Sequence, residues 1–173
     1  SPEVQAVIDE LKRLEYEGYQ FEGAEASFDL LIMKQLGMYR KLFDVKDFKV
    51  IADQPWQPSE RSAAAMIKVL VDGTEEMTAA EGDGPVDALD RALRKALEVF
   101  YPQLKKMYLT DYKVRVLDSR AATAAKVRVL IESSDGQDSW STVGVSTDII
   151  AASWIAMIDA IEYMLLKGKG DDK

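Results

Sequence analysis

Apolar residues recur at helical spacing over the first forty positions. The spacing i, i+3, i+4, i+7 predicts a helix over 2–17 and a second one from about 24 to 36. Pro2 suits the first helical turn, and glycines at 18 and 37 suit the two ends. The apolar stripes are formed by Val4, Val7, Ile8, Leu11 and Leu14, and by Phe28, Leu31, Ile32 and Leu36. Two short helices cannot bury both faces alone, so we expect a helical hairpin packed on a neighbour.

From residue 47 the pattern changes from helical spacing to alternation. The segments FKVIAD (48–53), AAAMIKVLVDG (63–73) and, more weakly, EEMTAAE (75–81) have the composition of strands. Asp72-Gly73 indicates a tight turn between the second and third strands. An amphipathic helix follows, and its apolar face runs from Ala88 to Phe100. We expect that helix to stop before Pro102, because proline cannot continue a helix.

The strand and helix pattern then repeats. YKVRVLD (112–118) matches FKVIAD, and AAKVRVLIES (124–133) matches AAMIKVLVDG (64–73) at an offset of 60. DSWSTVGVS (138–146) matches EEMTAAEGDG, and IIAASWIAMIDAIEYML (149–165) matches ALDRALRKALEVF at an offset of 61. Four successive matches at nearly one offset predict two βββα units.

The predicted fold class is therefore α+β, with two pseudo-twofold-related βββα units preceded by a short helical hairpin. In YKVRV, Tyr112 and Val114 share one face while Lys113 and Arg115 take the other, so each sheet has one solvated side. We expect a helical subdomain at 1–46, a domain at 47–167 with repeats at 47–102 and 108–167, and a disordered tail at 168–173.

Composition excludes several classes of function. The formal net charge of −8 argues against binding to nucleic acid or to an anionic membrane. The chain has no cysteine and no histidine, which removes disulfides, thiolate metal sites and the most common general base. Any catalysis would rest on carboxylates, Lys, Tyr or Ser. No apolar run approaches the length of a membrane span. Because the chain opens with Ser-Pro, we expect it to be part of a longer protein.

The stretch EGDGPVDALDRALRKAL (81–97) is the leading candidate for a binding site. Gly82 and Gly84 allow close backbone approach, and Pro85 presets the first helical turn. The free N–H groups of that turn can donate hydrogen bonds to an anion. No Gly-Lys-Ser/Thr follows, so it is not a P-loop. Asp83 and Asp87 would repel a phosphate, which favours the carboxylate of an amino acid. The alternative is a tight strand-to-helix turn without a ligand.

The matching turn VGVSTDIIAAS (143–153) combines a glycine, small residues and three N-cap candidates, Ser146, Thr147 and Asp148. Two symmetry-related helix N-termini would frame one pocket, with an apolar wall and the hydroxyl of Ser153. Asp111 is a candidate for an ammonium contact, although capping a strand is the more common role. Trp56, Trp140 and Trp154 are expected in the core or at an interface. No nucleophile stands beside a base, and no metal-ligand cluster is visible.

Four segments together resemble a known family. GDGPVDALDRALRKAL, YPQLKKMYLTDYKVRVLD, TAAKVRVLIES and WSTVGVSTDIIAASWIAMIDAIEYMLLK resemble the C-terminal regulatory (LeuA-type allosteric and dimerisation) domain of the 2-isopropylmalate synthase family. ELKRLEYEGYQFEGAEASFDLL resembles the linker helices that precede this domain, with wording closest to the citramalate synthase branch. The resemblance covers residues 3–167.

The resemblance implies an acetyl-CoA-dependent 2-oxo acid acyltransferase whose N-terminal barrel uses a divalent metal. That barrel carries a His-x-His motif, which this chain lacks, so no catalytic residue, metal or cofactor is expected here. It also implies a cytoplasmic homodimer that binds isoleucine or leucine for feedback inhibition. One side of the effector site would comprise Gly82, Gly84, Pro85, Val86 and Ala88, and the other Gly144, Val145, Ser146, Ile149, Ile150 and Ala151, with Asp111 and Tyr112 as further candidates.

Two other functions compete with this one. The first is a structural dimerisation module that binds no effector; it would form a dimer but show no thermal shift with branched-chain amino acids. A stand-alone carboxylate-based enzyme is disfavoured because histidine and any base–nucleophile pair are absent.

Overall fold

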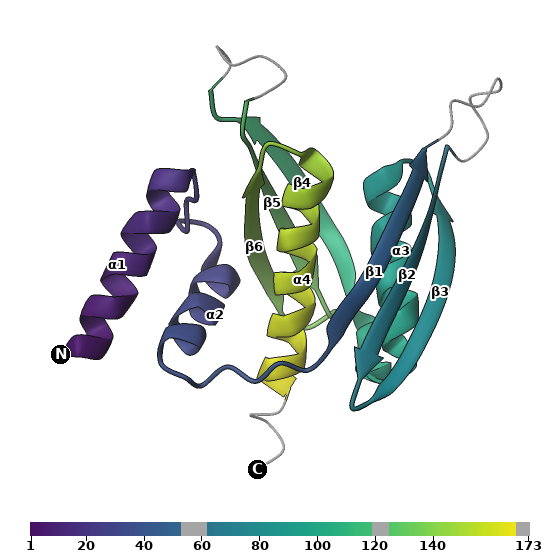
Figure 1. The fold of residues 1–173 in the computed structure, drawn as a ribbon, viewed down its shortest axis with the longest axis horizontal. Helices are drawn as coiled ribbons and strands as arrows, with labels where there is room; N and C mark the ends of the chain where they lie inside the picture. Colours follow the sequence, from purple (N-terminus) through teal and green to yellow (C-terminus); the bar gives the residue numbers. More distant parts are fainter. Residues whose placement is uncertain (53–61, 119–124, 169–173) are drawn as a thin grey trace. The chain divides into compact units, whose positions relative to one another are not determined.

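The computed structural model describes residues 1–52, 62–118 and 125–168 (Figure 1). Contacts divide the chain into two compact units, Lys41–Lys105 and Ser1–Arg40 with Lys106–Lys173. Trp56 and residues 169–173 lie outside the described residues, and so do the predictions made for them.

The unit at 41–105 is a three-stranded antiparallel sheet followed by a helix. The strands β1 (Asp44–Ala52), β2 (Ala63–Val71) and β3 (Thr74–Gly82) lie in the order β1-β2-β3, and α3 (Pro85–Glu98) follows. Asp72 and Gly73 have φ angles of 48° and 83°. Positive φ at both central residues is the conformation of a type I′ turn, the turn whose twist matches a β-hairpin. The short 3₁₀ helix η1 (Pro102–Lys106) then leads to the second sheet.

The second unit repeats this arrangement and adds two helices. The strands β4 (Tyr108–Val116), β5 (Val127–Ser134) and β6 (Ser139–Ser146) lie in the order β4-β5-β6, followed by α4 (Ile149–Gly168). The hairpin of α1 (Pro2–Glu17) and α2 (Glu25–Gln35) belongs to the same unit. The predicted fold class, α+β with two βββα units after a helical hairpin, is confirmed.

The offset between the repeats is 64, not 60 or 61. Asp44 pairs with Leu70, and Tyr108 and Ser134, each 64 positions later, pair with each other. Both first strands have a bulge at the same place, between Val45 and Asp47 and between Leu109 and Asp111. The offset of 60 matched similar letters but not the strand pairing, which keeps the offset of 64 in both the β1–β2 and β2–β3 ladders and their counterparts.

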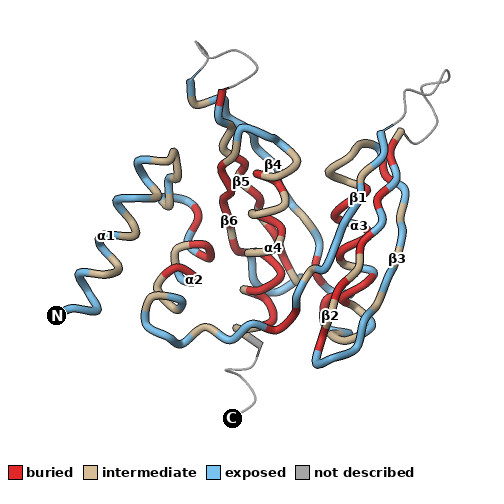
Figure 2. Tube along the Cα trace, viewed as in Figure 1, coloured by how far each residue is buried: buried red, intermediate tan, exposed pale blue. Residues whose placement is uncertain are grey.

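Columns of alanine on both helices face the sheets. Ala88, Ala92 and Ala96 of α3 are fully buried, and so are their counterparts in α4, Ala152, Ala156 and Ala160. The central strands β2 and β5 supply the other side of each core, as the burial colours of Figure 2 show. Small side chains let the helix backbone approach the sheet closely. Two side chains of β6 can therefore hydrogen-bond to the backbone of α4. Thr142 Oγ1 donates to Ala156 O (2.7 Å), and Trp140 Nε1 donates to Ala160 O (3.0 Å).

The helical hairpin covers the free edge of β6. The backbone N–H of Ser141 donates to Glu25 Oε1 (3.1 Å), and that of Val143 to Ser27 Oγ (2.9 Å). The backbone of Val145 hydrogen-bonds to Tyr19. Exposed strand edges can pair with other chains. Here the helical hairpin supplies hydrogen-bond partners to Ser141, Val143 and Val145, which are alternate residues along the edge.

Helix α1 is attached mainly through its C-terminus. It ends at Gly18, whose φ of 114° is left-handed, as the sequence predicts. It has no basic residue in its last turn. Instead, Lys126 Nζ donates to Glu17 O (3.2 Å) and Arg128 Nη1 to Gly18 O (3.1 Å), so β5 and the residue preceding it cap the helix. None of its residues is buried, and Val4 is 57% exposed.

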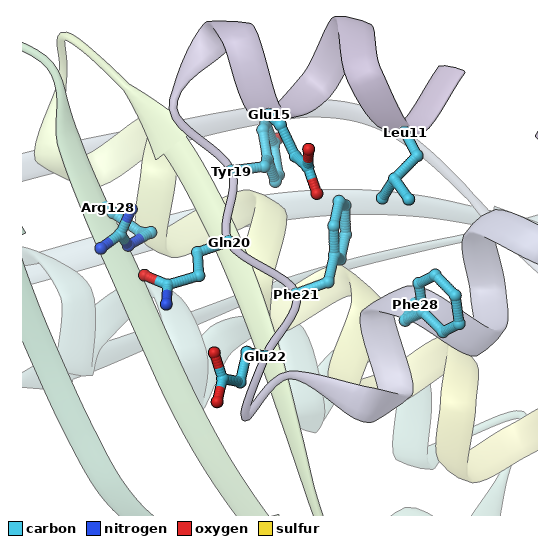
Figure 3. A pocket seen from close by; sticks show the side chains of 8 residues that line it. All are labelled: Leu11, Glu15, Tyr19, Gln20, Phe21, Glu22, Phe28 and Arg128. Atoms are coloured by element: carbon cyan, nitrogen blue, oxygen red, sulfur yellow. The ribbon is translucent and has the colours of Figure 1, made fainter. Parts of the chain in front are cut away.

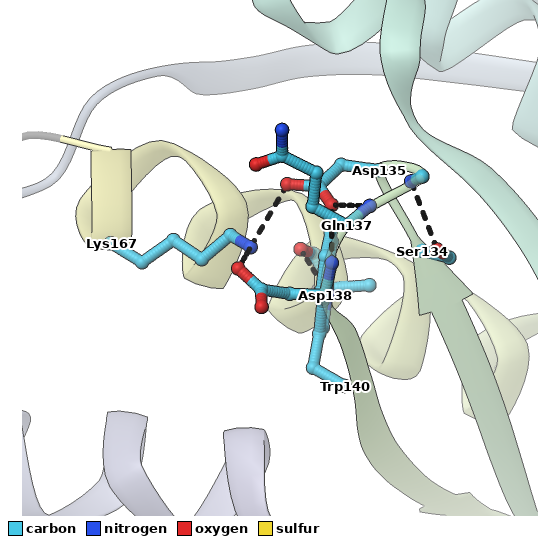
Figure 4. A network of polar contacts seen from close by, with 8 residues as sticks. Ser134, Asp135, Gln137, Asp138, Trp140 and Lys167 are labelled. Carbon is cyan, nitrogen blue, oxygen red and sulfur yellow. Dashed lines mark hydrogen bonds and ion pairs between the residues drawn. The ribbon is translucent and has the colours of Figure 1, made fainter.

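A polar network joins the β5–β6 turn to the end of α4 (Figure 4). Asp135 Oδ1 accepts hydrogen bonds from the backbone N–H groups of Asp138 (2.8 Å) and Gln137 (3.0 Å). These bonds, helped by Lys167, lower the pKa of Asp135 to about 2. Lys167 Nζ lies 4.2 Å from the ring centroid of Trp140. Trp140 is buried, as predicted, whereas Trp154 is only half-buried.

Within the described residues, one helix could cross a membrane by length and composition, which corrects the expectation that no apolar run is long enough. It is α4, over Ile149–Lys167, and half of its most apolar window is buried. Its alanine column lies on β5 and β6, so its apolar character is explained by the core of the unit.

Candidate functional site

The turn between β3 and α3 brings the helix backbone onto the strand. Gly82, the last residue of β3, is buried, and a Cβ built on it would overlap the backbone nitrogen of Ala88 and lie 2.7 Å from the Cα of Ala88. Glycine at this position is therefore a packing requirement. Ala88 is fully buried for the same reason. These two predicted site residues touch each other and form the floor of the turn.

Gly84 has a different role. It is the N-cap residue of α3, with extended backbone (φ 175°), and a Cβ built there would meet no atom within 4 Å. Among residues 1–52, 62–118 and 125–168, no side chain forms an N-cap hydrogen bond to this helix, and Pro85 and Val86 follow Gly84. Asp87 receives the Asp83 N–H at its Oδ2 (3.0 Å) and pairs with Arg91 (3.0 Å). Position 84 thus has open space around it, while the acid of the first turn, Asp87, is bonded to the Asp83 N–H and to Arg91.

The turn between β6 and α4 is built from the other set of candidates. A Cβ built on Gly144 would overlap the carbonyl oxygen of Ala152, so glycine is again required for helix approach. Ser146 Oγ accepts the Asp148 N–H (3.1 Å), and Asp148 Oδ1 accepts the Ile150 N–H (2.8 Å). Of the three N-cap candidates, Asp148 is the cap. Ile149 is exposed, while Ile150 and Ala151 are half-buried and Val145 is buried.

The two helix starts are therefore unequal. Position 84 corresponds to position 148 at the structural offset of 64, so a glycine in one repeat stands where an aspartate caps the helix in the other. Partial positive charge collects at a helix N-terminus. In α4 the carboxylate of Asp148 already meets that charge, whereas α3 has no acidic group at the equivalent position.

Tyr112 joins the second set through its hydroxyl. It lies 2.6 Å from Ser153 Oγ, and Ser153 is fully buried on α4. The equivalent residues in the first repeat, Phe48 and Leu89, are apolar. Asp111 follows the bulge of β4, accepts the Tyr112 N–H (2.9 Å) and pairs with Lys113 (3.4 Å). Its carboxylate therefore has local partners.

The candidates fall into two groups. Gly82, Gly84, Pro85, Val86 and Ala88 belong to one compact unit, and Asp111, Tyr112, Gly144, Val145, Ser146, Ile149, Ile150 and Ala151 to the other. In the first unit the candidates surround one strand-to-helix turn, and in the second unit so do the residues from Gly144 to Ala151. Tyr112 reaches α4 only through its hydroxyl, and Asp111 stays on β4 with local partners. The pairing of the two turns into one pocket stays a prediction.

Sequence reasoning missed a cluster of acids between α2 and α4. Asp159 Oδ2 accepts from Ser27 Oγ (2.8 Å), and Glu162 Oε1 accepts from Tyr39 OH (2.6 Å). Lys34 Nζ lies 3.9 Å from Glu162 Oε2. Asp159 lines a cavity and is half-buried. The protein around its carboxyl group excludes water, and this desolvation raises the pKa of Asp159 to about 7. The signal for this cluster in the sequence is the presence of two acids, Asp159 and Glu162, inside the apolar run IAMIDAIEYM (155–164).

Comparison with known proteins agrees with this fold. The sequence model of the LeuA allosteric (dimerisation) domain matches residues 22–165. The (R)-citramalate synthase of Aquifex aeolicus is 52% identical over 167 residues, which cover 96% of this chain and 32% of that protein. That of Geobacter sulfurreducens is 52% identical over 163 residues, covering 94% and 31%.

A more distant relative is the 2-isopropylmalate synthase of Aquifex aeolicus, which is 32% identical over 129 residues, covering 75% of this chain and 23% of that protein. The chain thus spans about a third of the length of the citramalate synthases it matches. The match over residues 22–165 covers both βββα units and both glycine-dependent turns, so the fold and the comparison support the same family. The chain belongs to the LeuA allosteric (dimerisation) domain family of the citramalate and 2-isopropylmalate synthases.

Proposed function

We propose that this chain is the end-product sensor of a citramalate synthase and binds a branched-chain amino acid, isoleucine or leucine, for feedback inhibition. The observation that supports the proposal most is the inequality of the two helix starts. The uncapped turn of α3 at Gly84 offers N–H groups and open space to a carboxylate. The turn of α4, already capped by Asp148, offers Ile149, Ile150 and Ala151 to an apolar side chain.

The remaining parts of the ligand also have chemical partners. The carboxylate of Asp83, which is exposed beside Gly84, suits the ammonium group. An apolar pocket distinguishes isoleucine from leucine by the position of one methyl group, which contributes only about 1–3 kcal/mol. Both amino acids therefore remain candidates until their affinities are compared.

The contacts of β6 support a route by which binding alters the rest of the protein. This strand carries Gly144, Val145 and Ser146, and its edge N–H groups donate to Glu25 and Ser27 of α2. A shift of β6 would change the bonds that hold the linker helices. Effector binding would then favour one arrangement of these helices, which is a coupling free energy between two sites.

The relatives' names extend the proposal to the whole protein. We infer a cytoplasmic homodimer in which an N-terminal catalytic barrel, with acetyl-CoA and a divalent metal, performs the acyl transfer. The apolar residues Val4 and Ile8, exposed on α1, are suited to contact that barrel. The effector site of this chain would regulate the barrel and would not itself catalyse a reaction.

Isothermal titration of the chain with isoleucine, leucine and valine, with sedimentation to establish its oligomeric state, tests the proposal. We expect saturable binding of isoleucine or leucine by a dimer, with valine weaker. A folded dimer that gives no heat with any of the three would overturn the sensing role and leave a structural dimerisation module. A ligand at a hundred times its Kd contributes about 2.7 kcal/mol to stability, so an absent thermal shift would be equally decisive.

A further inference from the structure

A basic groove lies on the face of the β4–β5 sheet that is opposite α4. Its volume is about 490 Å³, and its lining combines three cations, Lys113, Arg115 and Arg128, with one acid, Glu22. Gln20, Val114, Leu130 and Val143 complete the lining. A lining with an excess of two positive charges is notable in a chain whose formal net charge is −8.

The two arginines stand directly opposite each other across the strand pair. Side chains in that relation have Cβ atoms about 5 Å apart, and like charges there are destabilising. The pKa of Arg128 is lowered, first by its burial and then by the charge of Arg115. The fold does not need this pair, because the equivalent positions in the first repeat hold Ile51 and Ala64.

The arginines have few partners of their own. Arg128 gives one bond, from Nη1 to the neutral carbonyl of Gly18 (3.1 Å). No hydrogen bond or ion pair joins Arg115 to any residue within 1–52, 62–118 or 125–168. Lys113 pairs only at 3.4 Å with the exposed Asp111. Two guanidinium groups therefore line one groove, and although Glu22 lines it too, no carboxylate of the described residues is hydrogen-bonded or ion-paired to either of them.

A second cavity of about 630 Å³ continues from the groove and shares Gln20, Glu22 and Arg128 with it (Figure 3). Tyr19, Phe21 and Phe28 line this cavity together with Leu11 and the acids Glu15 and Glu22. The rings of Tyr19 and Phe21 are stacked, with centroids 5.7 Å apart. Arg128 thus lies where a basic compartment meets an aromatic one.

We propose that the groove binds an organic phosphate, with the phosphate between Arg115 and Arg128 and a flat apolar body directed toward Tyr19 and Phe21. A phosphate dianion offsets both excess charges at one point and accepts the forked bonds of two guanidinium groups. A monocarboxylate would leave one charge uncompensated. A dicarboxylate separates its charges along a carbon chain, whereas the two arginines are adjacent. This proposal does not depend on the amino-acid site.

The probe for this site is phenyl phosphate, titrated calorimetrically into the chain in a buffer of low chloride content. We expect saturable binding that weakens as salt is raised, and succinate binding at least tenfold more weakly. Arg115→Gln should reduce the affinity for phenyl phosphate at least tenfold. Lys49→Gln is the matched control, because Lys49 is the exposed equivalent of Lys113 in the first repeat, and it should change the affinity less than twofold.

Thermal unfolding distinguishes binding from a structural role. Without ligand, Arg115→Gln should unfold at the same temperature as the parent chain or higher, because a repulsion is removed. With phenyl phosphate, only the parent chain and Lys49→Gln should gain stability. Equal loss of affinity in both variants, succinate binding as tight as phenyl phosphate, or no saturable binding would each overturn the proposal.

Discussion

At the scale of single residues, glycines that look alike in the sequence have different physical roles. Gly82 and Gly84 stand two positions apart in one motif, yet only Gly82 touches the helix backbone. Sequence reasoning predicted correctly that glycine permits close approach in this turn. It could not separate the two positions, because the distance from each Cα to the helix depends on how the helix lies on the strand.

Replacing Gly82 with alanine should destabilise the chain, because the added methyl group would overlap the backbone of Ala88. Forcing a group into such a packed site costs about 1–3 kcal/mol or more. Gly84→Ala is the control, since its methyl group enters open space at an extended backbone position. Urea unfolding measures the free energy of unfolding of both variants. Equal stability of Gly82→Ala and the parent chain would contradict the packing role.

Gly84→Asp should separate stability from binding. The aspartate reproduces in α3 the cap that Asp148 provides in α4, and an acidic N-cap in place of glycine is worth a few tenths of a kcal/mol. The same carboxylate would occupy the place proposed for that of the amino acid. We expect unchanged or slightly higher thermal stability and a loss of isoleucine or leucine binding by calorimetry. In the whole enzyme, feedback inhibition should be lost and catalysis kept.

Retained amino-acid affinity in a folded Gly84→Asp chain would place the ligand carboxylate elsewhere. The alanine variant again serves as the control, since it adds bulk without charge. We expect Gly84→Ala to bind more weakly than the parent chain but more tightly than Gly84→Asp.

The stability of the chain should depend on pH through Asp159. Its pKa is about 7 in the fold, against an ordinary value of 3.8. Because the folded state holds a proton that the unfolded state has released, stability from this group is present below pH 4 and is lost as the pH rises toward 7. Asp159→Asn should therefore stabilise the chain at pH 8, by about 1–3 kcal/mol.

Urea unfolding of Asp159→Asn at pH 5 and pH 8 tests this sign. The advantage of the variant over the parent chain should be smaller at pH 5. Lys34 and Glu162 are the charged groups that act on this carboxyl group, and Glu10 and Lys34 line the same cavity. All three residues are the same in the variant and the parent chain. Asp29→Asn, an exposed change on α2, is the control and should have the same effect at both values. An advantage that is larger at pH 5 would refute the assignment.

At the scale of elements, the sequence was most informative where the backbone has a local signal. Gly18 ends α1, Asp72-Gly73 forms the hairpin turn, and the apolar face of α3 is buried from Ala88 to Leu97, as the pattern predicts. The strands β1 and β4 start four positions earlier than predicted, because pairing continues on the N-terminal side of the bulges near Lys46 and Thr110. Pairing register depends on partners distant in the sequence, which letter matching cannot supply.

The edge of β6 was not predictable for the same reason. Ser27 and Glu25 read as ordinary polar residues of a short helix, yet they accept the N–H groups of Val143 and Ser141. Ser27 Oγ also donates to Asp159. One hydroxyl therefore connects α2 and β6, the two elements through which the proposed coupling runs, to α4.

Ser27→Ala should loosen this connection. It leaves the buried N–H of Val143 and the carboxyl of Asp159 without their partner, and an unsatisfied buried group costs about 1–3 kcal/mol. Native-state hydrogen exchange should show faster exchange at Val143 and Ser141, while amides of the central strand β5 stay protected. Ser139→Ala, an exposed change in the same strand, is the control. Unchanged exchange at Val143 would show that α2 does not hold this edge.

At the scale of the whole molecule, the repeat predicted the fold class, but the pairing of the two turns remains the untested step. The internal repeat showed that two similar units exist, and the family match supports the same conclusion. A ligand held by both turns would have an unusual effect. It would link the stabilities of the two units, because each unit would lose its part of the site when the other unfolded.

Hydrogen exchange with and without a saturating branched-chain amino acid tests this linkage directly. If both turns hold one ligand, protection should increase together at residues 82–88, in the uncapped turn, and at residues 144–152, in the turn capped by Asp148. The type I′ turn at Asp72-Gly73 is the internal control and should exchange at the same rate in both states. Protection confined to 82–88 would leave the carboxylate contact in place but remove the apolar wall assigned to Ile149 and Ile150. Protection confined to 144–152 would instead refute the role of Gly84 and require a different site for the carboxylate.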